Sequence, residues 1–159
     1  MEDNGLKFCY SRRFAVFSAV TLAWMAVIFL FSSQNGDDSS GISDFLIRLL
    51  CGIVRCDPTP DVFSVMSLII RKAAHMTEFG ILALLWLGTL HSGFPGFQWR
   101  YPAAFAAASL YAATDEVHQL FVSGRAGQVT DWLIDSYGAL IFLSAAWIIS
   151  KFFMQRMTK

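Results

Sequence analysis

The sequence is poor in charged residues and carries no net charge. Only 15% of its 159 residues are charged, whereas soluble domains have roughly a quarter. Twelve basic and twelve acidic residues balance, so the electrostatic footprint of a nucleic-acid-binding protein is absent. Hydrophobic residues make up 55% of the chain and its mean hydropathy is +0.50. These values indicate a single membrane-embedded domain.

Metal-binding and disulfide motifs are also scarce. The three cysteines, Cys9, Cys51 and Cys56, form no CxxC pair and no Cys/His array, so a structural zinc site is not expected. No HExxH motif occurs either. Cys51 and Cys56 fall in a predicted extracytoplasmic loop. A disulfide between them is one interpretation, and two small apolar residues on an amphipathic helix is the other.

Four apolar segments are predicted to cross the membrane. Residues 14–31 are uncharged over 18 residues, close to the ~20 that a spanning helix needs. This run exceeds the apolar core of a signal peptide, and no small-x-small cleavage site follows it. We therefore predict an uncleaved first span. The other predicted spans cover about residues 62–90, 102–121 and 130–153.

The chain between the first two predicted spans is expected to contain a surface helix. Residues 32–40 are rich in Ser, Asp, Asn and Gly and are expected to form a loop. In residues 42–54 the apolar residues repeat at helical spacing, but the segment is too short to span. The predicted fold class is all-α: an integral membrane bundle of four transmembrane helices, with a short amphipathic helix in the first extracytoplasmic loop.

Basic residues predict the orientation of this bundle. Arg12 and Arg13 precede the first span, and Lys151, Arg156 and Lys159 lie at the end of the chain. An excess of Lys and Arg marks cytoplasmic segments. Four spans return the chain to its starting side, so the tails 1–13 and 154–159 are both expected in the cytoplasm. The start of the second span, the end of the third and the start of the fourth then share the outer level.

Ionisable residues concentrate at this predicted outer level. Such groups are costly near hydrocarbon unless they face the bundle interior or water, so we interpret the cluster as a functional site. The candidate catalytic residues are His75, Glu78, Asp115, Glu116 and His118, and the candidate substrate-binding residues are Arg71, Lys72, Gln119, Arg125, Asp131 and Asp135.

Several chemistries fit this set of residues. Five carboxylates oppose three fixed cations, so protons or a metal cation must help to balance the charge. His75 with Glu78, and Asp115 with His118, are each spaced i, i+3 on a helix and would suit a divalent metal that activates water. Without a metal, the three cations would bind the phosphate or carboxylate of a lipid-linked or cell-wall precursor. A carboxylate-oriented histidine would then move protons, with Asp131 and Gln119 orienting their partners.

Two interpretations without catalysis stay open. Ion pairs such as Arg71–Glu78 and Arg125–Asp131 would pin the helices together in a membrane scaffold, and their charges would have no further role. A proton- or ion-coupled carrier is the other alternative, and so small a chain would have to oligomerise to form one.

Several stretches together resemble the VanZ-like family of bacterial membrane proteins. They are FSSQ at 31–34, RKAAHMTEFGIL at 71–82, YAATDEVHQLFVSGRAGQVTDWLID at 111–135, and Gly138. The resemblance covers about residues 14–150 and implies a four-span protein of the bacterial cytoplasmic membrane. The family takes its name from a protein that raises resistance to teicoplanin. Membership therefore implies a link to cell-envelope components or antibiotic tolerance, but no particular reaction.

Overall fold

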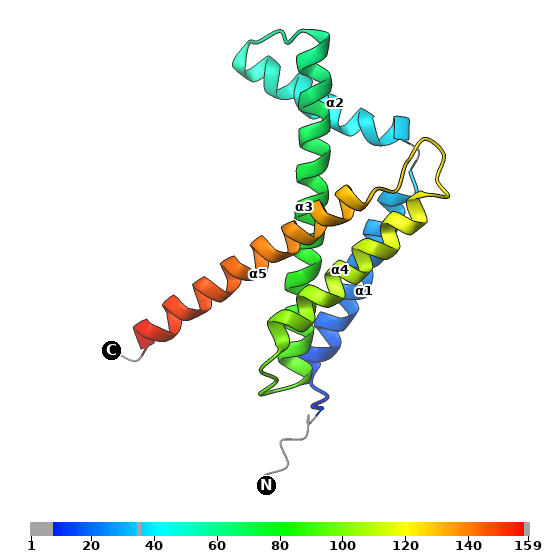
Figure 1. The fold of residues 1–159 in the computed structure, drawn as a ribbon. Coiled ribbons are helices and arrows are strands. Elements are labelled where there is room, and N and C mark those ends of the chain that lie inside the picture. Colours follow the sequence, from blue (N-terminus) through cyan, green and yellow to red (C-terminus); the bar gives the residue numbers. More distant parts are fainter. Residues whose placement is uncertain (1–7, 35, 158–159) are drawn as a thin grey trace.

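A computed structural model describes residues 8–34 and 36–157, and within them the chain forms five α-helices and no strand. The helices are α1 (Arg12–Ser32), α2 (Gly36–Val54), α3 (Pro60–Gly93), α4 (Arg100–Gln119) and α5 (Val129–Met157). The all-α prediction is confirmed over these residues. Figure 1 shows the helices joined by short connections.

Three of the described helices, α1, α3 and α5, are long and apolar enough to cross a membrane. The predicted third span, 102–121, corresponds to α4 but is not in this group. Its apolar residues are largely alanines, which add little hydrophobicity each, and its last turn contains Asp115 and Glu116. The length and composition of the helices therefore support α1, α3 and α5 as membrane spans.

The first connecting segment differs from its prediction. Residues 36–40 belong to α2, so the loop predicted for 32–40 is wrong over that part. Asp and Ser residues suit the first turn of a helix as well as a loop, which explains the error. α2 packs against α3 and buries Ser43, Ile47 and Cys51 at four-residue spacing. Most of the apolar residues that predicted this helix, among them Phe45 and Leu49, are exposed.

The two cysteines of this region are free thiols at the end of α2. Cys51 is buried and Cys56 is exposed. The backbone N–H of Cys56 donates to the carbonyl of Cys51 at 3.0 Å, which closes the helix end, and Arg55 takes a positive φ of 58° there.

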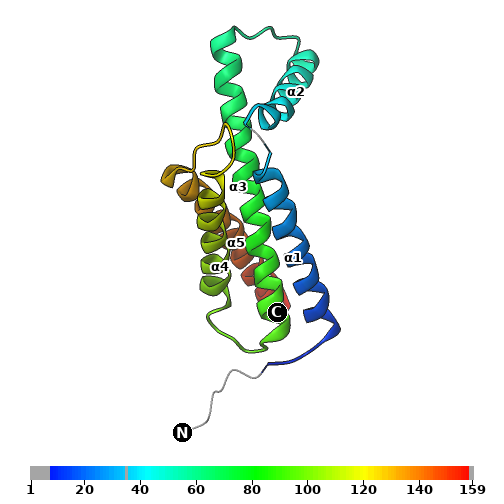
Figure 2. The same cartoon turned by 90° about the vertical axis from the view of Figure 1, so that its right-hand side faces the viewer.

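α3 is the central helix, because it packs against each of the four others. Its 34 residues extend over about 51 Å at 1.5 Å per residue, well beyond the ~30 Å of a bilayer core. Figures 1 and 2 show that one part of α3 packs among α1, α4 and α5, while its first turns stand beyond them beside α2. At that end Ser67 Oγ donates to Asp44 Oδ1 at 3.0 Å.

The core lies where α3 meets α4 and α5. Phe79 and Leu82 of α3 are fully buried, and α4 presents Ala104, Ala108 and Ala112 at four-residue spacing. Small residues at this spacing let helices approach closely.

Gly138 of α5 makes the closest approach to α3. A Cβ added to it would lie 2.2 Å from the carbonyl oxygen of Met76, so only glycine fits the crossing as it stands. This crossing sets Asp131 and Asp135 of α5 beside Lys72 and His75 of α3.

Polar contacts between helices fix α1 in the bundle. Thr21 and Thr89 hydroxyls lie 3.1 Å apart, and Trp24 Nε1 donates to the carbonyl of Glu78 at 3.0 Å. Tyr111 of α4 donates its hydroxyl to the carbonyl of Met25 at 2.7 Å. In a low-dielectric surrounding such bonds hold helices in register.

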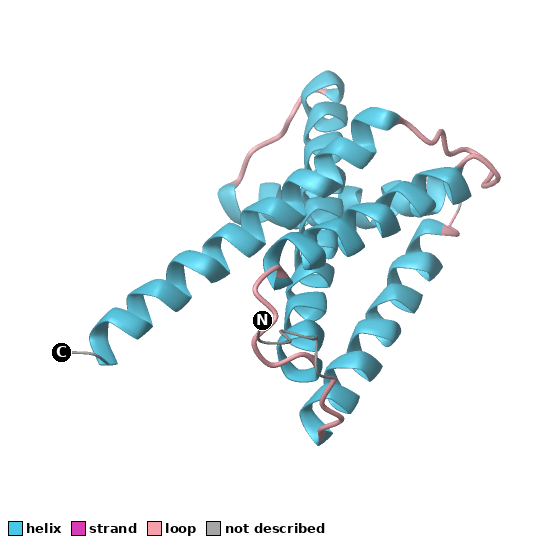
Figure 3. Ribbon diagram, turned by 60° about the horizontal axis from the view of Figure 1, so that its bottom comes forward, coloured by secondary structure: helices cyan, strands magenta, loops and turns pink. Residues whose placement is uncertain are grey.

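The second half of α5 departs from the other helices. Figures 1 and 3 show it running away from α1 and α4. Its apolar side chains there are exposed, including Trp147, Ile149 and Phe153. A surface of this kind suits contact with lipid.

Candidate functional site

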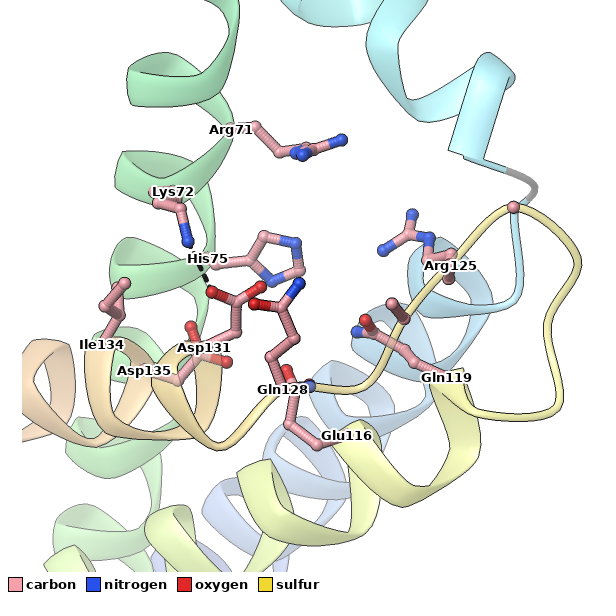
Figure 4. Close-up of a pocket in the computed structure, with 12 residues that line it drawn as sticks. Arg71, Lys72, His75, Glu116, Gln119, Arg125, Gln128, Asp131, Ile134 and Asp135 are labelled. Atoms are coloured by element: carbon pink, nitrogen blue, oxygen red, sulfur yellow. Dashed lines mark hydrogen bonds and ion pairs between the residues drawn. The ribbon is translucent and has the colours of Figure 1, made fainter.

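A cavity of about 240 Å³ lies where α3, α4, α5 and the 120–128 loop meet (Figure 4). We call it the polar pocket. It is lined by Arg71, Lys72, His75, Glu116, Gln119, Gly124, Arg125, Ala126, Gln128, Asp131, Ile134 and Asp135. Eight of the eleven predicted site residues are therefore brought together in one cavity, although they lie far apart in the sequence.

Lys72 and Asp131 join the two helices that cross at Gly138. Lys72 Nζ lies 2.5 Å from Asp131 Oδ1, and the two side chains are 33% and 35% exposed. An ion pair exposed to this degree stabilises by about 0–1 kcal/mol. The main effect of this pair is therefore to orient two side chains of the pocket, and its contribution to the stability of the fold is small.

His75 lies one turn from Lys72 and Arg71 on α3. Its Nδ1 is 3.8 Å from Glu78 Oε2, which is too far for a hydrogen bond. This nitrogen is buried and has no hydrogen-bond partner in the described part of the chain. The ring is therefore placed in the pocket without being fixed by a strong bond.

Arg71 is the pocket cation whose guanidinium has no partner among the described residues. The side chain is half-buried and lines the polar pocket and two neighbouring cavities. It makes no hydrogen bond or ion pair with any described residue. The other two cations of the pocket, Lys72 and Arg125, both have partners.

The carboxylates of α4 and α5 differ in what they contact. Glu116 Oε2 accepts the backbone N–H of Gln128 at 2.8 Å. Buried Asp115 accepts from Gln119 Nε2 at 2.9 Å. Asp135 is only 1% exposed, and its Oδ2 has no hydrogen-bond partner among the described residues.

Arg125 fastens the 120–128 loop to the end of α1. Its Nε donates to the carbonyl of Gln34 at 3.0 Å, and its Nη2 donates to the carbonyl of Phe31 at 3.2 Å. Carbonyls at a helix C-terminus lack partners within the helix and favour a cation. Gly124, with φ of 76°, supplies a turn conformation that other residues rarely adopt.

Arg71 and Arg125 lie close enough to affect each other. Burial, together with the positive charge of Arg71, lowers the pKa of Arg125 from its ordinary value, although nearby carboxylates oppose the shift. An anion placed beside the two guanidinium groups would relieve this repulsion.

Three predicted site residues lie outside the polar pocket. Glu78 lines an adjoining cavity of about 180 Å³ that also includes Arg71, His75 and Arg125. Asp115 lines neither cavity. His118 faces α1, where its Nε2 lies 3.1 Å from Ser33 Oγ and its ring is stacked at 4.6 Å on Phe29.

The two ion pairs expected for a scaffold do not form. Among the described residues Lys72 pairs with Asp131, and the nearest basic group to Glu78 is His75 at 3.8 Å, so the Arg71–Glu78 and Arg125–Asp131 pairs were wrong. Residues seven positions apart on a helix are separated by about 10 Å along the axis, which is a long reach for Arg71 to Glu78. Arg125 is instead occupied by the carbonyls of α1.

Sequence reasoning missed several residues that build the site. Gln128 contributes its backbone N–H, which no side-chain pattern reveals. A Cβ at Gly127 would lie 2.2 Å from the carbonyl of Glu116, so the loop passes tightly over the end of α4. The pair of glycines at 124 and 127 was the available signal for this close approach.

Metal ligation has no geometric support in the part of the chain that the structure describes. No group of three or more His, Cys, Asp or Glu side chains there is arranged to hold an ion. The acids are separated by partners such as Lys72 and Gln128.

Comparison with known protein families identifies the family of this chain. The family model described as VanZ/LLP1 matches residues 17–150, a range that includes every residue lining the polar pocket. Searches of curated proteins and of solved structures gave no match. Together with its long apolar helices, the match shows that this chain is a membrane protein of the VanZ-like family.

Proposed function

We propose that the polar pocket binds a phosphate or carboxylate in the head group of a lipid or lipid-linked cell-envelope component. Arg71 carries this proposal, because it is half-buried beside the pocket and unpaired among the described residues. A cation withdrawn from water without a partner is unfavourable. A phosphate or carboxylate would accept two N–H donors from its planar guanidinium.

The proposed topology has four spans, α1, α3, α4 and α5, with both chain ends in the cytoplasm of a bacterium. α4 is included because it packs against α1, α3 and α5 and its alanines form part of the core. The basic residues at 12–13 and near the chain end fit this orientation. The pocket then opens at the outer side of the cytoplasmic membrane, and the exposed apolar residues of α2 face the membrane surface.

Acid–base groups adjoin the proposed ligand site. His75 and Glu116 line the pocket with Arg71, and Glu78 lies in the adjoining cavity. Such groups transfer protons when they reach a bound substrate. Modification of the bound head group is thus a second step of the proposal, after binding.

Drug tolerance follows from the same proposal. A protein that holds an envelope component at the outer leaflet would change the access of glycopeptides such as teicoplanin to the cell surface. The effect would depend on the pocket and hence on Arg71.

The scaffold alternative is favoured by a separate set of contacts. Arg125 ties the loop to α1, Lys72 pairs with Asp131 between α3 and α5, and Glu116 holds Gln128. In that case these groups only lock the helices, and loss of any one would lower the amount of folded protein.

Arg71→Ala separates the two functions. We expect the purified variant to retain severalfold less anionic lipid or lipid-linked phosphate than wild type, measured by mass spectrometry of extracted lipids, because one charge-assisted contact is worth about 1.5–3 kcal/mol. In a teicoplanin-sensitive host the same variant should lose any tolerance that the wild type confers.

Arg156→Ala is the matched control. It removes an exposed cation from the last turn of α5, far from the pocket, and should leave lipid retention unchanged. Equal retention by Arg71→Ala and wild type, at equal membrane levels, would refute binding. Degradation or misinsertion of Lys72→Met would instead support the scaffold, because that substitution breaks the contact between α3 and α5.

A further inference from the structure

We infer that the pocket recognises a zwitterionic head group, a phosphate joined through a short arm to a primary amine, as in phosphatidylethanolamine. This inference rests on the proposed function and specifies its ligand. It is drawn from the polar groups that remain unsatisfied after every described contact in the pocket is counted.

Most charged groups of the pocket already have partners. Lys72 is paired with Asp131, and Glu116 accepts from Gln128. Arg125 donates two of its N–H groups to α1 carbonyls. These groups form the walls of the pocket, and most of their hydrogen-bonding capacity is already used within the protein.

The unsatisfied groups include one fixed cation and one buried carboxyl oxygen. Arg71 has no described partner, and neither Asp135 Oδ2 nor His75 Nδ1 accepts or donates a hydrogen bond in the described part. Figure 4 shows Arg71 on one side of His75 and Asp135 on the other. A complementary ligand therefore needs an acceptor group at one end and a donor group at the other.

The balance of charge argues against a simple anion. The carboxylates of Glu116, Asp131 and Asp135 line the same cavity as the cations, so a phosphate alone would bring added negative charge close to them. A zwitterion adds no net charge. Its phosphate would face Arg71, while its ammonium would face Asp135.

Hydrogen-bond chemistry selects among the amines. A primary ammonium carries three N–H donors and can give Asp135 a charge-assisted bond. A quaternary ammonium has no N–H and would leave the buried Oδ2 unsatisfied. A head group such as phosphocholine should therefore bind less well than one with a primary amine.

The size of the cavity suits a head group and excludes the rest of a lipid. Its volume is about 240 Å³. The acyl chains would remain outside. Ile134 provides an apolar part of the wall, and Leu133 beside it is exposed.

The test compares four ligands on the purified full-length protein in non-ionic detergent. They are short-chain phosphatidylethanolamine, phosphatidylglycerol, phosphatidylcholine and soluble phosphoethanolamine, with binding measured by native mass spectrometry. We expect phosphatidylethanolamine to bind roughly tenfold more tightly than the other two lipids, the value of one charged hydrogen bond.

Asp135→Asn identifies the origin of the preference. It should reduce the advantage of phosphatidylethanolamine over phosphatidylglycerol to within about twofold, because the ammonium loses its carboxylate partner and the anionic lipid loses a repulsive charge. Retained phosphatidylglycerol binding shows that the pocket is folded. Asp61→Asn, at the exposed start of α3, is the matched control and should keep the preference.

Each outcome has a distinct meaning. Equal binding of the three lipids, with all binding lost in Arg71→Ala, would overturn the zwitterion and leave the proposed function standing. Lipid binding that is unaffected by Arg71→Ala would overturn both. Binding of phosphoethanolamine as strong as that of the lipid supports the same chemistry, with a soluble source in place of a lipid.

Discussion

At the scale of single residues, two arginines of the pocket have different roles. Arg125 donates to the carbonyls of Gln34 and Phe31, so it completes the end of α1 and positions the loop. Arg71 has no described partner and remains available for a ligand. A substitution at Arg125 is therefore expected to affect folding, whereas one at Arg71 is expected to affect binding.

The Lys72–Asp131 pair should contribute little to stability. In a double-mutant cycle with Lys72→Met and Asp131→Asn, we predict a coupling energy below about 1 kcal/mol, because both side chains are about one-third exposed. The measurement is unfolding in mixed detergent micelles. A coupling above about 2 kcal/mol would show that the pair locks α3 to α5, as a scaffold requires.

At the scale of helices, the crossing of α3 and α5 determines where the pocket forms. Gly138→Ala would bring a Cβ to 2.2 Å from the carbonyl oxygen of Met76 and 2.7 Å from its Cα. We predict a loss of about 1–3 kcal/mol of stability, since the backbones must separate. The apparent melting temperature in detergent should fall.

Gly52→Ala is the control for that prediction. A Cβ at Gly52 of α2 would have nothing within 4 Å, and alanine favours a helix over glycine by about 1 kcal/mol. It should leave the melting temperature unchanged or raise it. If Gly138→Ala behaved like Gly52→Ala, the close crossing of α3 and α5 would be wrong.

The sequence predicted which segments form helices better than it predicted the residues at which those helices begin and end. Long uncharged runs predicted α1 and α5 well, because hydrophobic length is a strong and local signal. The start of α2 was missed, since Asp and Ser residues suit a loop and a helix N-terminus equally. The alanine-rich segment predicted for the third span does form a helix, α4, but this helix is less apolar than the other predicted spans.

The candidate site was predictable in its location and not in its individual contacts. The basic residues at the two chain ends, together with four spans, predicted that the polar segments around His75, Glu116 and Asp131 lie at the same depth in the membrane. These three residues do line one cavity. Helix geometry could have separated Glu116 from His118, because two residues turn the helix by about 200°. The backbone bonds of Arg125 and Gln128 depend on tertiary packing and leave no sequence pattern.

At the scale of the whole molecule, α3 connects two parts of the fold. One part of α3 packs among the other long helices, and its first turns stand beyond them with α2 (Figures 1 and 2). The polar pocket lies at the junction of these two parts, at residues 71–75. This position suits a membrane interface, where a head group meets polar side chains and its acyl chains stay in lipid.

The central claim is that the pocket opens on the outer side of the membrane. The most direct measurement uses a variant with Cys9, Cys51 and Cys56 replaced by alanine, in which one new cysteine is labelled with a membrane-impermeant maleimide on intact spheroplasts. Ala126→Cys places the thiol in the exposed pocket loop. Trp99→Cys, at a residue 70% exposed between α3 and α4, is the matched control.

We predict that the cysteine at position 126 reacts before lysis and that the cysteine at position 99 reacts only after the membrane is opened. Both termini would then be cytoplasmic by the four-span topology. Labelling of position 99 from outside, with position 126 protected until lysis, would contradict the account.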